Sequence, residues 1–263
     1  MADFFGFAEE LVNKGRAKKG DPYASAELYD LLVRTGSDDH FYVQFAKERG
    51  GKVLDLACGS GRLIPPLIEA GLEVTGLDLS VPMLERAKAR LGPEASRATL
   101  VEGDMRFFSF TELFDTIIIP YCSFMYMHSD GDRLAVLQSC YDHLKRDGYL
   151  VFDFLAGSVE LGEGWPKLAL QGIHPLTEEI FLSVVQIKGL ATDLRLLNQI
   201  NYVYPKEPKL PQISVYSSKE AVVFPERITE LLVTIGFEPE GVYNNSSLQE
   251  YDGGEECLIV AYK

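Results

Sequence analysis

The chain has 263 residues, of which 46% are hydrophobic, and this is enough apolar material for one large domain or two smaller ones. Its formal net charge of −14 and its lack of any basic run argue against a nucleic-acid partner, because binding to phosphate backbones depends on Lys and Arg. The four cysteines are scattered with no CxxC pair, so the sequence predicts neither a metal site nor a disulfide framework. The N-terminus lacks the basic flank of a secretory signal, and no segment has the apolar length of a membrane span. We therefore expect a cytoplasmic protein, monomeric or homodimeric, with no membrane contact.

Apolar residues in the first 50 positions recur at intervals of three and four, which is typical of helices buried on one face. The three stretches with this spacing are Phe4 to Leu11, Leu28 to Leu32, and Phe41 to Ala46. We interpret residues 1–50 as an N-terminal helical lid.

A buried strand, a glycine turn and a helix are expected next. Val53 to Ala57 is the near-continuous apolar run of a strand covered on both faces, and Gly59 and Gly61 allow the following backbone to approach a ligand. The pair Pro65-Pro66 falls in the following helix, where Pro is tolerated only in the first turn. Either that helix begins near Leu63, or the pair kinks it.

The second strand, Glu73 to Asp78, ends in a carboxylate at the position where doubly wound sheets bind the two hydroxyls of a ribose. A dinucleotide fold would also have a third glycine at the position of Ile64, where it allows tight packing of helix on strand. Ile64, together with the negative charge of Asp55, suits a ligand that is uncharged or cationic at this point. An NAD-dependent dehydrogenase therefore fits less well, although it stays an alternative.

The segment Asp55-Leu56-Ala57-Cys58-Gly59-Ser60-Gly61 resembles the first motif of the class I S-adenosylmethionine-dependent methyltransferases. Gly103-Asp104-Met105-Arg106, which follows a short strand at 98–101, extends the resemblance to the place where these enzymes bind adenine. The match spans roughly residues 51 to 155. It implies S-adenosyl-L-methionine as cofactor, with contacts from Asp55, Ala57, Cys58, Gly59, Gly61, Asp78, Leu79, Asp104, Met105 and Tyr121, and from Tyr23, Tyr29 and Arg34 in the lid.

Strands and helices continue to alternate as far as Phe154. We expect a buried strand at 114–120, a helix that begins after Ser129 with Leu134, Leu137, Tyr141 and Leu144 inward, and a glycine turn at Gly148 before a strand that ends at Asp153. Residues 157–224 show only extended segments, at 179–187, 195–204 and 212–217, which predict an inserted antiparallel sheet. The core resumes at Pro225 with one helix and two strands.

The expected fold class is thus α/β: a Rossmann-like, doubly wound, mostly parallel sheet with an antiparallel C-terminal hairpin, the helical lid and the inserted sheet. We expect three parts: the lid at 1–50, the cofactor-binding core at 51–156 and 225–263, and a substrate-cover sheet at 157–224.

The loop after the fourth strand, Tyr121 to His128, is the predicted acceptor side, because ligands of open α/β sheets bind beyond the carboxyl ends of the strands. Methyl transfer from a sulfonium is a direct displacement, so alignment and at most one base are needed. Tyr126, Ser123 and His128 are the catalytic candidates; the alternative is that this loop only covers apolar core.

The loop and the insertion also resemble the glycine and sugar-amine N-methyltransferases, in which an antiparallel flap covers the acceptor. Those sugar-amine enzymes often have His where Tyr126 falls. We expect a methyltransferase acting on an N or O atom of a small-molecule methyl acceptor. A non-catalytic S-adenosylmethionine-binding regulator is the alternative from another class.

Overall fold

The computed structural model describes residues 4–20, 38–173, 177–207, 209–244, 246 and 248–263. The chain forms two compact units. One contains the first helix, the first short strand and the strands between residues 159 and 221, and the other contains residues 38–158 and 222–263. The first 50 residues are therefore divided between the two units, although the sequence suggested a single lid.

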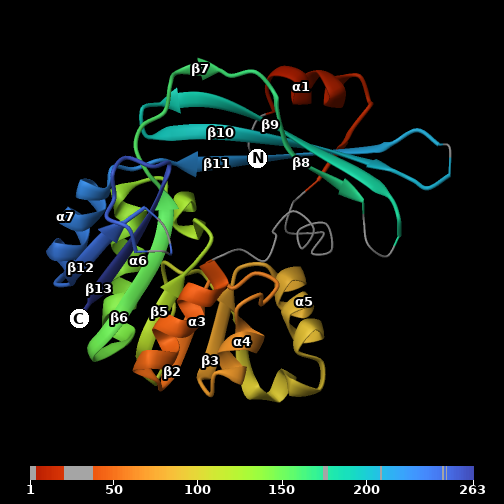
Figure 1. The fold of residues 1–263 in the computed structure, drawn as a ribbon. Helices are drawn as coiled ribbons and strands as arrows, with labels where there is room; N and C mark the ends of the chain where they lie inside the picture. Colours follow the sequence, from red (N-terminus) through yellow and green to blue (C-terminus); the bar gives the residue numbers. More distant parts are fainter. Residues whose placement is uncertain (1–3, 21–37, 174–176, 208, 245, 247) are drawn as a thin grey trace. The chain divides into compact units, whose positions relative to one another are not determined.

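The larger unit is built on a seven-stranded sheet with the order β12-β13-β6-β5-β2-β3-β4 (Figure 1). Its strands are β2 (Lys52–Leu56), β3 (Glu73–Asp78), β4 (Ala98–Glu102), β5 (Phe114–Ile119), β6 (Leu144–Leu155), β12 (Glu238–Tyr243) and β13 (Glu256–Tyr262). Neighbouring strands in the series β4, β3, β2, β5 and β6 pair in parallel, whereas β13 pairs antiparallel with both β6 and β12. This is the predicted fold, including the antiparallel C-terminal hairpin.

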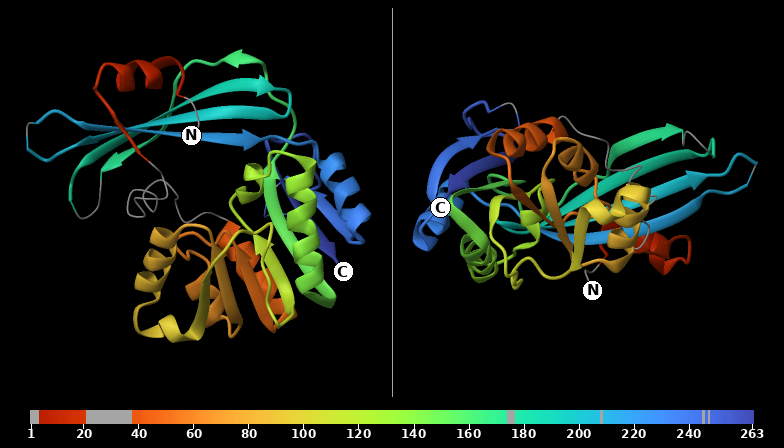
Figure 2. Two further views of the ribbon diagram at one scale, coloured as in Figure 1. Left: turned by 180° about the vertical axis from the view of Figure 1, so that it is seen from behind. Right: turned by 90° about the horizontal axis from the view of Figure 1, so that it is seen from below.

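Helices cover both faces of this sheet, as crossovers between parallel strands require. They are α3 (Asp38–Arg49), α4 (Ile64–Glu69), α5 (Val81–Leu91), α6 (Asp130–His143) and α7 (Pro225–Ile235), with short 3₁₀ segments η1 (Gly92–Arg97) and η2 (Ser123–Tyr126). Figure 2 shows α3 and α6 on opposite faces. The strand order reverses between β5 and β3, on either side of β2, and this is the point at which open α/β sheets bind ligands.

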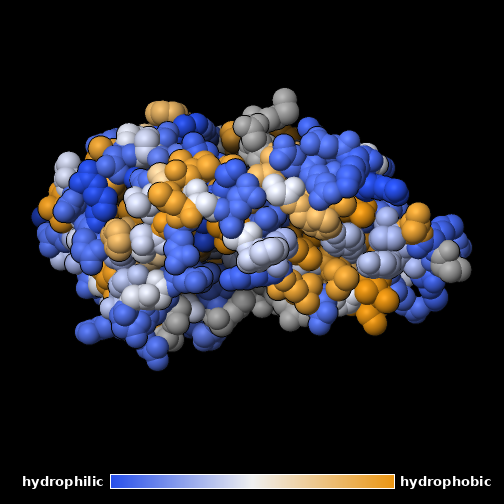
Figure 3. All heavy atoms as spheres, turned by 90° about the horizontal axis from the view of Figure 1, so that it is seen from above, coloured by the Kyte–Doolittle hydropathy of each residue, from blue (hydrophilic) through white to orange (hydrophobic). Residues whose placement is uncertain are grey.

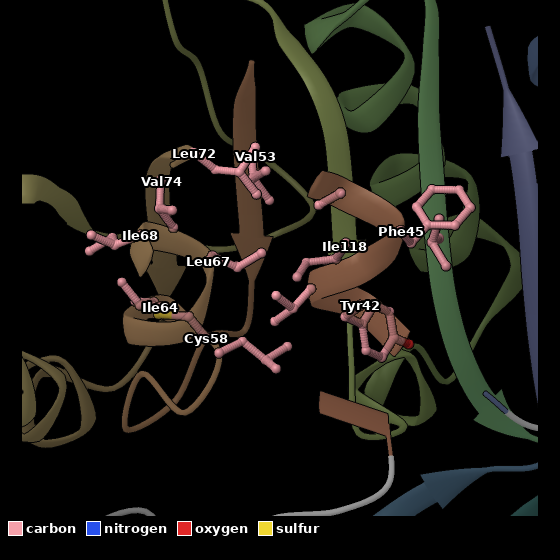
Figure 4. Close-up of a cluster of buried hydrophobic side chains, with 14 of the residues drawn as sticks. Tyr42, Phe45, Val53, Cys58, Ile64, Leu67, Ile68, Leu72, Val74 and Ile118 are labelled. Atoms are coloured by element: carbon pink, nitrogen blue, oxygen red, sulfur yellow. The ribbon is translucent and has the colours of Figure 1, made fainter. Parts of the chain in front are cut away.

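The apolar core under α3 and α4 fixes the position of β2. Tyr42, Ile64 and Leu67 from the helices pack with Val53 and Ile118 from the strands, and all five are buried (Figure 4). The residues on this face alternate along each strand, so Asp55 shares the face of Val53 and points toward the same side of the sheet.

Two local predictions can be compared with the structure. The helix α4 begins at Ile64, so Pro65 and Pro66 occupy its first turn and cause no kink. The predicted turn at Gly148 is found as an irregularity inside β6, which runs from Leu144 to Leu155: β5 pairs with Leu144 and then with Tyr149, and Asp147 has a φ of +63°.

The smaller unit is a six-stranded sheet with the order β1-β11-β10-β9-β7, in which β8 also pairs with β9. Its elements are α1 (Gly6–Asn13), β1 (Lys18–Lys19), β7 (Gly162–Glu163), β8 (Lys167–Ile173), β9 (Ile180–Ala191), β10 (Leu194–Tyr204) and β11 (Gln212–Ala221). All pairs are antiparallel except β1 with β11. Ala8 of α1 packs on Ile200 and Val215, so the helix covers one face of the sheet.

Strand β8 was not predicted, because its alternation of apolar and polar residues is weak and Trp165, Leu168 and Ile173 in and beside it are exposed. Figure 3 shows hydrophobic residues interspersed among hydrophilic ones on the surface. Among the described residues, no helix combines the length and apolar character needed to cross a membrane.

Candidate active site

The turn between β2 and α4 is fastened to the end of β3 by one carboxylate. The backbone N–H of Gly59 donates to Oδ2 of Asp78 at 2.7 Å, and the N–H of Ser80 donates to Oδ1 at 2.8 Å. The N–H of Cys58 also donates to the carbonyl of Leu77 at 3.1 Å. Asp78 thus shapes the glycine turn and, with its remaining lone pairs, is placed at the carboxyl edge of the sheet to accept further hydrogen bonds.

Gly61 is the point of closest approach between this turn and α5. Its φ is +72°, and a Cβ at this position would lie 2.8 Å from Cβ of Ala87. The same turn contains Ala57 with a positive φ of +56°, which an L residue adopts only under constraint. The turn is therefore held in one conformation by sequence and packing together.

Asp55 lies at the carboxyl end of β2 and is buried. Burial and the negative charge of Asp78 raise its pKa well above the ordinary value. Its Oδ1 has no hydrogen-bond partner among the described residues. Desolvation likewise raises the pKa of Asp78, although the N–H groups of Ser80 and Gly59 oppose that shift. An unpaired buried carboxyl oxygen at the switch point of the sheet indicates a missing partner.

Asp104 and Met105 lie just beyond β4. Asp104 accepts from the backbone N–H of Arg106 at 2.9 Å and from its guanidinium at 2.6 Å, and these bonds lower the pKa of Asp104. Arg106 also donates to Asp132 of α6 at 2.8 Å, so it ties the loop to the helix. Met105 is buried, and Leu79 after β3 is exposed.

The loop after β5 begins with two residues in left-handed conformation, Tyr121 and Cys122. The Tyr121 ring is half-exposed, and the guanidinium of Arg62, from the glycine turn, lies 5.6 Å from its centre. Ser123 donates its hydroxyl to the carbonyl of Pro120 at 2.8 Å.

The predicted catalytic side chains are spread along this loop. Ser123 and Tyr126 bound the 3₁₀ segment η2, and His128 comes two residues after it; all three are half-buried. Their roles stay predictions. Tyr23, Tyr29 and Arg34 lie outside the described residues.

Two side chains at this edge of the sheet were not singled out from the sequence. Asp153, near the end of β6, accepts from the backbone of the Tyr121-Cys122 turn, and Tyr42 of α3 donates its hydroxyl to Asp153 at 3.1 Å. A carboxylate at the end of a buried strand was the available signal for Asp153, since Asp55 and Asp78 were found in that way. The pairing of Tyr42 with Asp153 spans 111 positions and leaves no local signal.

Comparison with known proteins agrees with this geometry. Residues 53–148 match the family model described as a methyltransferase domain. The predicted relationship to the S-adenosylmethionine-dependent methyltransferases, including the glycine and sugar-amine types, is confirmed.

A glycine/sarcosine N-methyltransferase from Aphanothece halophytica is 35% identical over 53% of this chain and 54% of its own length. A solved S-adenosylmethionine-dependent methyltransferase from Clostridium acetobutylicum has a TM-score of 0.75 at 20% identity, over 90% of this chain and 96% of that chain. An amino pentose methyltransferase from Micromonospora echinaspora, solved with S-adenosylmethionine bound, has a TM-score of 0.67 at 17% identity, over 100% and 99% of the two chains. At such identities the solved structures show the fold. The chain spans about half the length of the curated relatives it matches.

Proposed function

We propose that this protein transfers the methyl group of S-adenosylmethionine to a nitrogen atom of a small metabolite. The observation that carries the proposal is Asp78, which closes the glycine turn through Gly59 and stands beside the buried, unpaired Oδ1 of Asp55 on the neighbouring strand. A ribose offers two hydroxyl donors to Asp78, and a cation favours the ionised form of Asp55.

The start of α4 disfavours a dinucleotide. A pyrophosphate needs free N–H groups at a helix N-terminus. Here the N–H of Ile64 donates to the carbonyl of Gly61 at 3.3 Å, and the next two residues, Pro65 and Pro66, have no N–H. The side chain of Ile64 is itself buried in the core. We therefore favour S-adenosylmethionine over NAD as the ligand.

When bound, S-adenosylmethionine supplies a methyl group on a sulfonium, which a nucleophile takes by direct displacement. The protein then has to bind, orient and exclude water. We assign binding to Asp78 and Asp104, and orientation of the acceptor to the loop that contains Ser123 and Tyr126. The phenol O–H can donate a hydrogen bond to a neutral amine, and the phenol oxygen can accept one from an N–H of the amine or of its ammonium form.

We infer an amine acceptor for two reasons. The relative from Aphanothece halophytica is named for a glycine nitrogen, and the solved enzyme from Micromonospora echinaspora is named for an amino pentose. The net charge of −14 also attracts cationic amines by long-range electrostatics. A hydroxyl acceptor gains nothing from that field.

The decisive experiment offers paired acceptors that differ only in the reacting atom, glycine with glycolate and an amino sugar with its hydroxy counterpart. Isotope-labelled S-adenosylmethionine reports methyl uptake, and S-adenosylhomocysteine release reports turnover. We expect transfer to the amine of a pair and none to its hydroxyl partner. The variant Asp78→Ala controls for contaminating enzymes and should lose turnover in parallel with cofactor binding.

Three other outcomes would contradict the proposal in distinct ways. Transfer to hydroxyls alone would reverse the choice of atom. Tight binding of S-adenosylhomocysteine with no transfer to any acceptor would favour the regulatory alternative. Tight binding of NAD would favour the dehydrogenase alternative.

We further propose that the six-stranded sheet covers the acceptor. The support is that the solved methyltransferases match nearly the whole chain, so this sheet belongs to the shared fold. A variant in which a short linker replaces residues 159–221 tests this role. Cofactor binding should persist and methyl transfer should be lost; retained transfer would refute the role of the sheet.

A further inference from the structure

The loop after β5 starts in a conformation that L residues rarely adopt. Tyr121 and Cys122 have φ values of +61° and +53°, so two consecutive non-glycine residues are left-handed. Each such residue costs about 1–2 kcal/mol relative to the right-handed region. The turn therefore needs partners that hold it.

Asp153 supplies those partners. Its Oδ1 accepts the backbone N–H of Cys122, and the N–H of Tyr121 also interacts with this carboxylate. Its Oδ2 accepts the hydroxyl of Tyr42 at 3.1 Å. Successive backbone N–H groups in such a turn form a concavity that binds an anion, and here the anion is a side chain of the same domain.

Packing fixes both the carboxylate and the hydroxyl in place. The neighbours of Asp153 along β6, Phe152 and Phe154, point to the other face, where Phe152 packs on Phe124 of η2 with ring centres 4.7 Å apart. Tyr42 is fully buried on α3, and Figure 4 shows its hydroxyl at the margin of the apolar cluster. Asp153 is thus held between the helix α3 and the loop that it shapes.

We propose that Asp153 is a positioning residue for methyl transfer, that its ionised form holds the Tyr121-Cys122 turn, and that protonation releases this turn. The inference rests on the proposed function, because the loop from Tyr121 to His128 is the assigned acceptor side. In this role Asp153 acts through the backbone that carries Tyr121, Ser123 and Tyr126, and not by contact with a ligand.

The groups around Asp153 place its titration near neutral pH. Tyr42 and Asp38 face it from α3, Tyr121 and Cys122 face it from the loop, and Leu258 lies opposite on β13. Desolvation raises the pKa of Asp153 to about 7, against the opposing effects of the Cys122 N–H and the Tyr42 hydroxyl. Below that pH the neutral acid is a weaker acceptor than the carboxylate, so the turn loses part of its support.

Amide hydrogen exchange of the ligand-free protein tests the first step. Rates are compared at pH 8 and pH 6 after correction for intrinsic exchange. Loss of a charge-assisted bond should speed exchange of the Cys122 amide by about tenfold at pH 6. In Asp153→Asn the rate should not change with pH, because the amide does not ionise. The control Asp142→Asn, on the exposed side of α6, should behave as wild type.

Tyr42→Phe keeps the proposal testable if the Asn variant folds poorly. Removing the hydroxyl donor raises the pKa of Asp153 further, so the pH at which the loop loosens should move upward. An exchange rate at Cys122 that does not change between pH 6 and 8 in wild type overturns the proposal. So does a pH dependence that persists in Asp153→Asn.

The second step is measured on the reaction. The acceptor is the one found by the paired-acceptor experiment. As the pH is lowered through 7, kcat of the wild type should fall by more than protonation of the free acceptor amine accounts for. The KM for S-adenosylmethionine should change little. Asp153→Asn should have a low kcat and should lack this added dependence, whereas a simple loss of folded protein would leave the shape of the profile unchanged. If exchange behaves as expected but no acceptor is methylated, the proposed function fails and the role of Asp153 in the loop stands.

Discussion

Replacing Gly61 by Ala should distort the glycine turn, because this residue has no room for a side chain. The added Cβ would lie 2.8 Å from Cβ of Ala87 and 3.2 Å from its Cα, and a φ of +72° is unfavourable for alanine. Since Ala87 is buried on α5, the clash is with a rigid neighbour and cannot be relieved by rotating a long side chain.

The magnitude follows from two separate effects. The left-handed conformation costs alanine about 1–2 kcal/mol. Overpacking against Ala87 adds about 1–3 kcal/mol. Gly71 provides the matched control, because its φ is +89° and a Cβ there would meet no atom within 4 Å. Gly71→Ala should therefore lose only the first amount, part of which is offset by the reduced freedom of the unfolded chain.

Urea unfolding and calorimetry with S-adenosylhomocysteine measure both consequences. We expect Gly61→Ala to be less stable than Gly71→Ala by about 1–3 kcal/mol and to bind the ligand more weakly, while Gly71→Ala binds as wild type. The double variant Gly61→Ala/Ala87→Gly removes the clashing Cβ and should recover part of the loss. Equal stability of the two single variants, or no recovery in the double variant, would refute the reasoning.

Three further outcomes are expected. Asp78→Ala should weaken S-adenosylhomocysteine binding by about 1.5–3 kcal/mol, measured by calorimetry, since it removes the proposed ribose acceptor and the bond to Gly59. Wild-type affinity would show that Asp78 only shapes the turn. Arg106→Ala should reduce about tenfold the ratio of the affinities for S-adenosylhomocysteine and for its inosine analogue. The reason is that Asp104, at the expected adenine position, loses the guanidinium that holds it. An unchanged ratio would contradict this. Global unfolding responds to pH with the opposite sign to the turn, because it exposes Asp153 to water and restores the ordinary carboxyl pKa. The raised pKa of Asp153 in the folded protein gives stability that is fully present below the ordinary carboxyl value and is lost as the pH rises through about 7. The wild-type melting temperature should therefore fall from pH 6 to pH 8 relative to Asp153→Asn, and parallel curves would exclude the shift.

The part of the fold that the sequence predicted is the part set by neighbours along the chain. β3 ends at Asp78 as expected, and the helix after Ser129 begins with that side chain accepting the N–H of Asp132. Both signals are local: an apolar run closed by an acid, and a capping residue. The inward face of α6 was only partly correct. Leu137 is buried as predicted. Val136 and Cys140 are also buried, whereas Leu134 and Tyr141, which were expected to be, are only half-buried.

The missed features depend on contacts between distant positions. Gly148 predicted a turn, but not that Leu144 pairs with Phe114 of β5 before that turn, so that β6 begins at Leu144. Arg106 was quoted only as part of a motif, and its bond to Asp132 follows from how α6 crosses the sheet. Tyr42 was not singled out from the sequence, because its hydroxyl has a partner only where α3 lies against the end of β6.

Four carboxylates follow or end strands at the same edge of the sheet, and they differ in how their charge is compensated. Asp78, Asp104 and Asp153 each accept a hydrogen bond from at least one backbone N–H. Each of these side chains therefore holds a loop in place most firmly in its ionised form. Asp55 is buried, has a raised pKa, and has an oxygen without a partner among the described residues. A ligand that carries positive charge near Asp55 would lower that pKa and release a proton on ionising the group. The three paired acids therefore hold the loops in place, and Asp55 is the acid whose electrostatic cost a bound cation such as S-adenosylmethionine would remove.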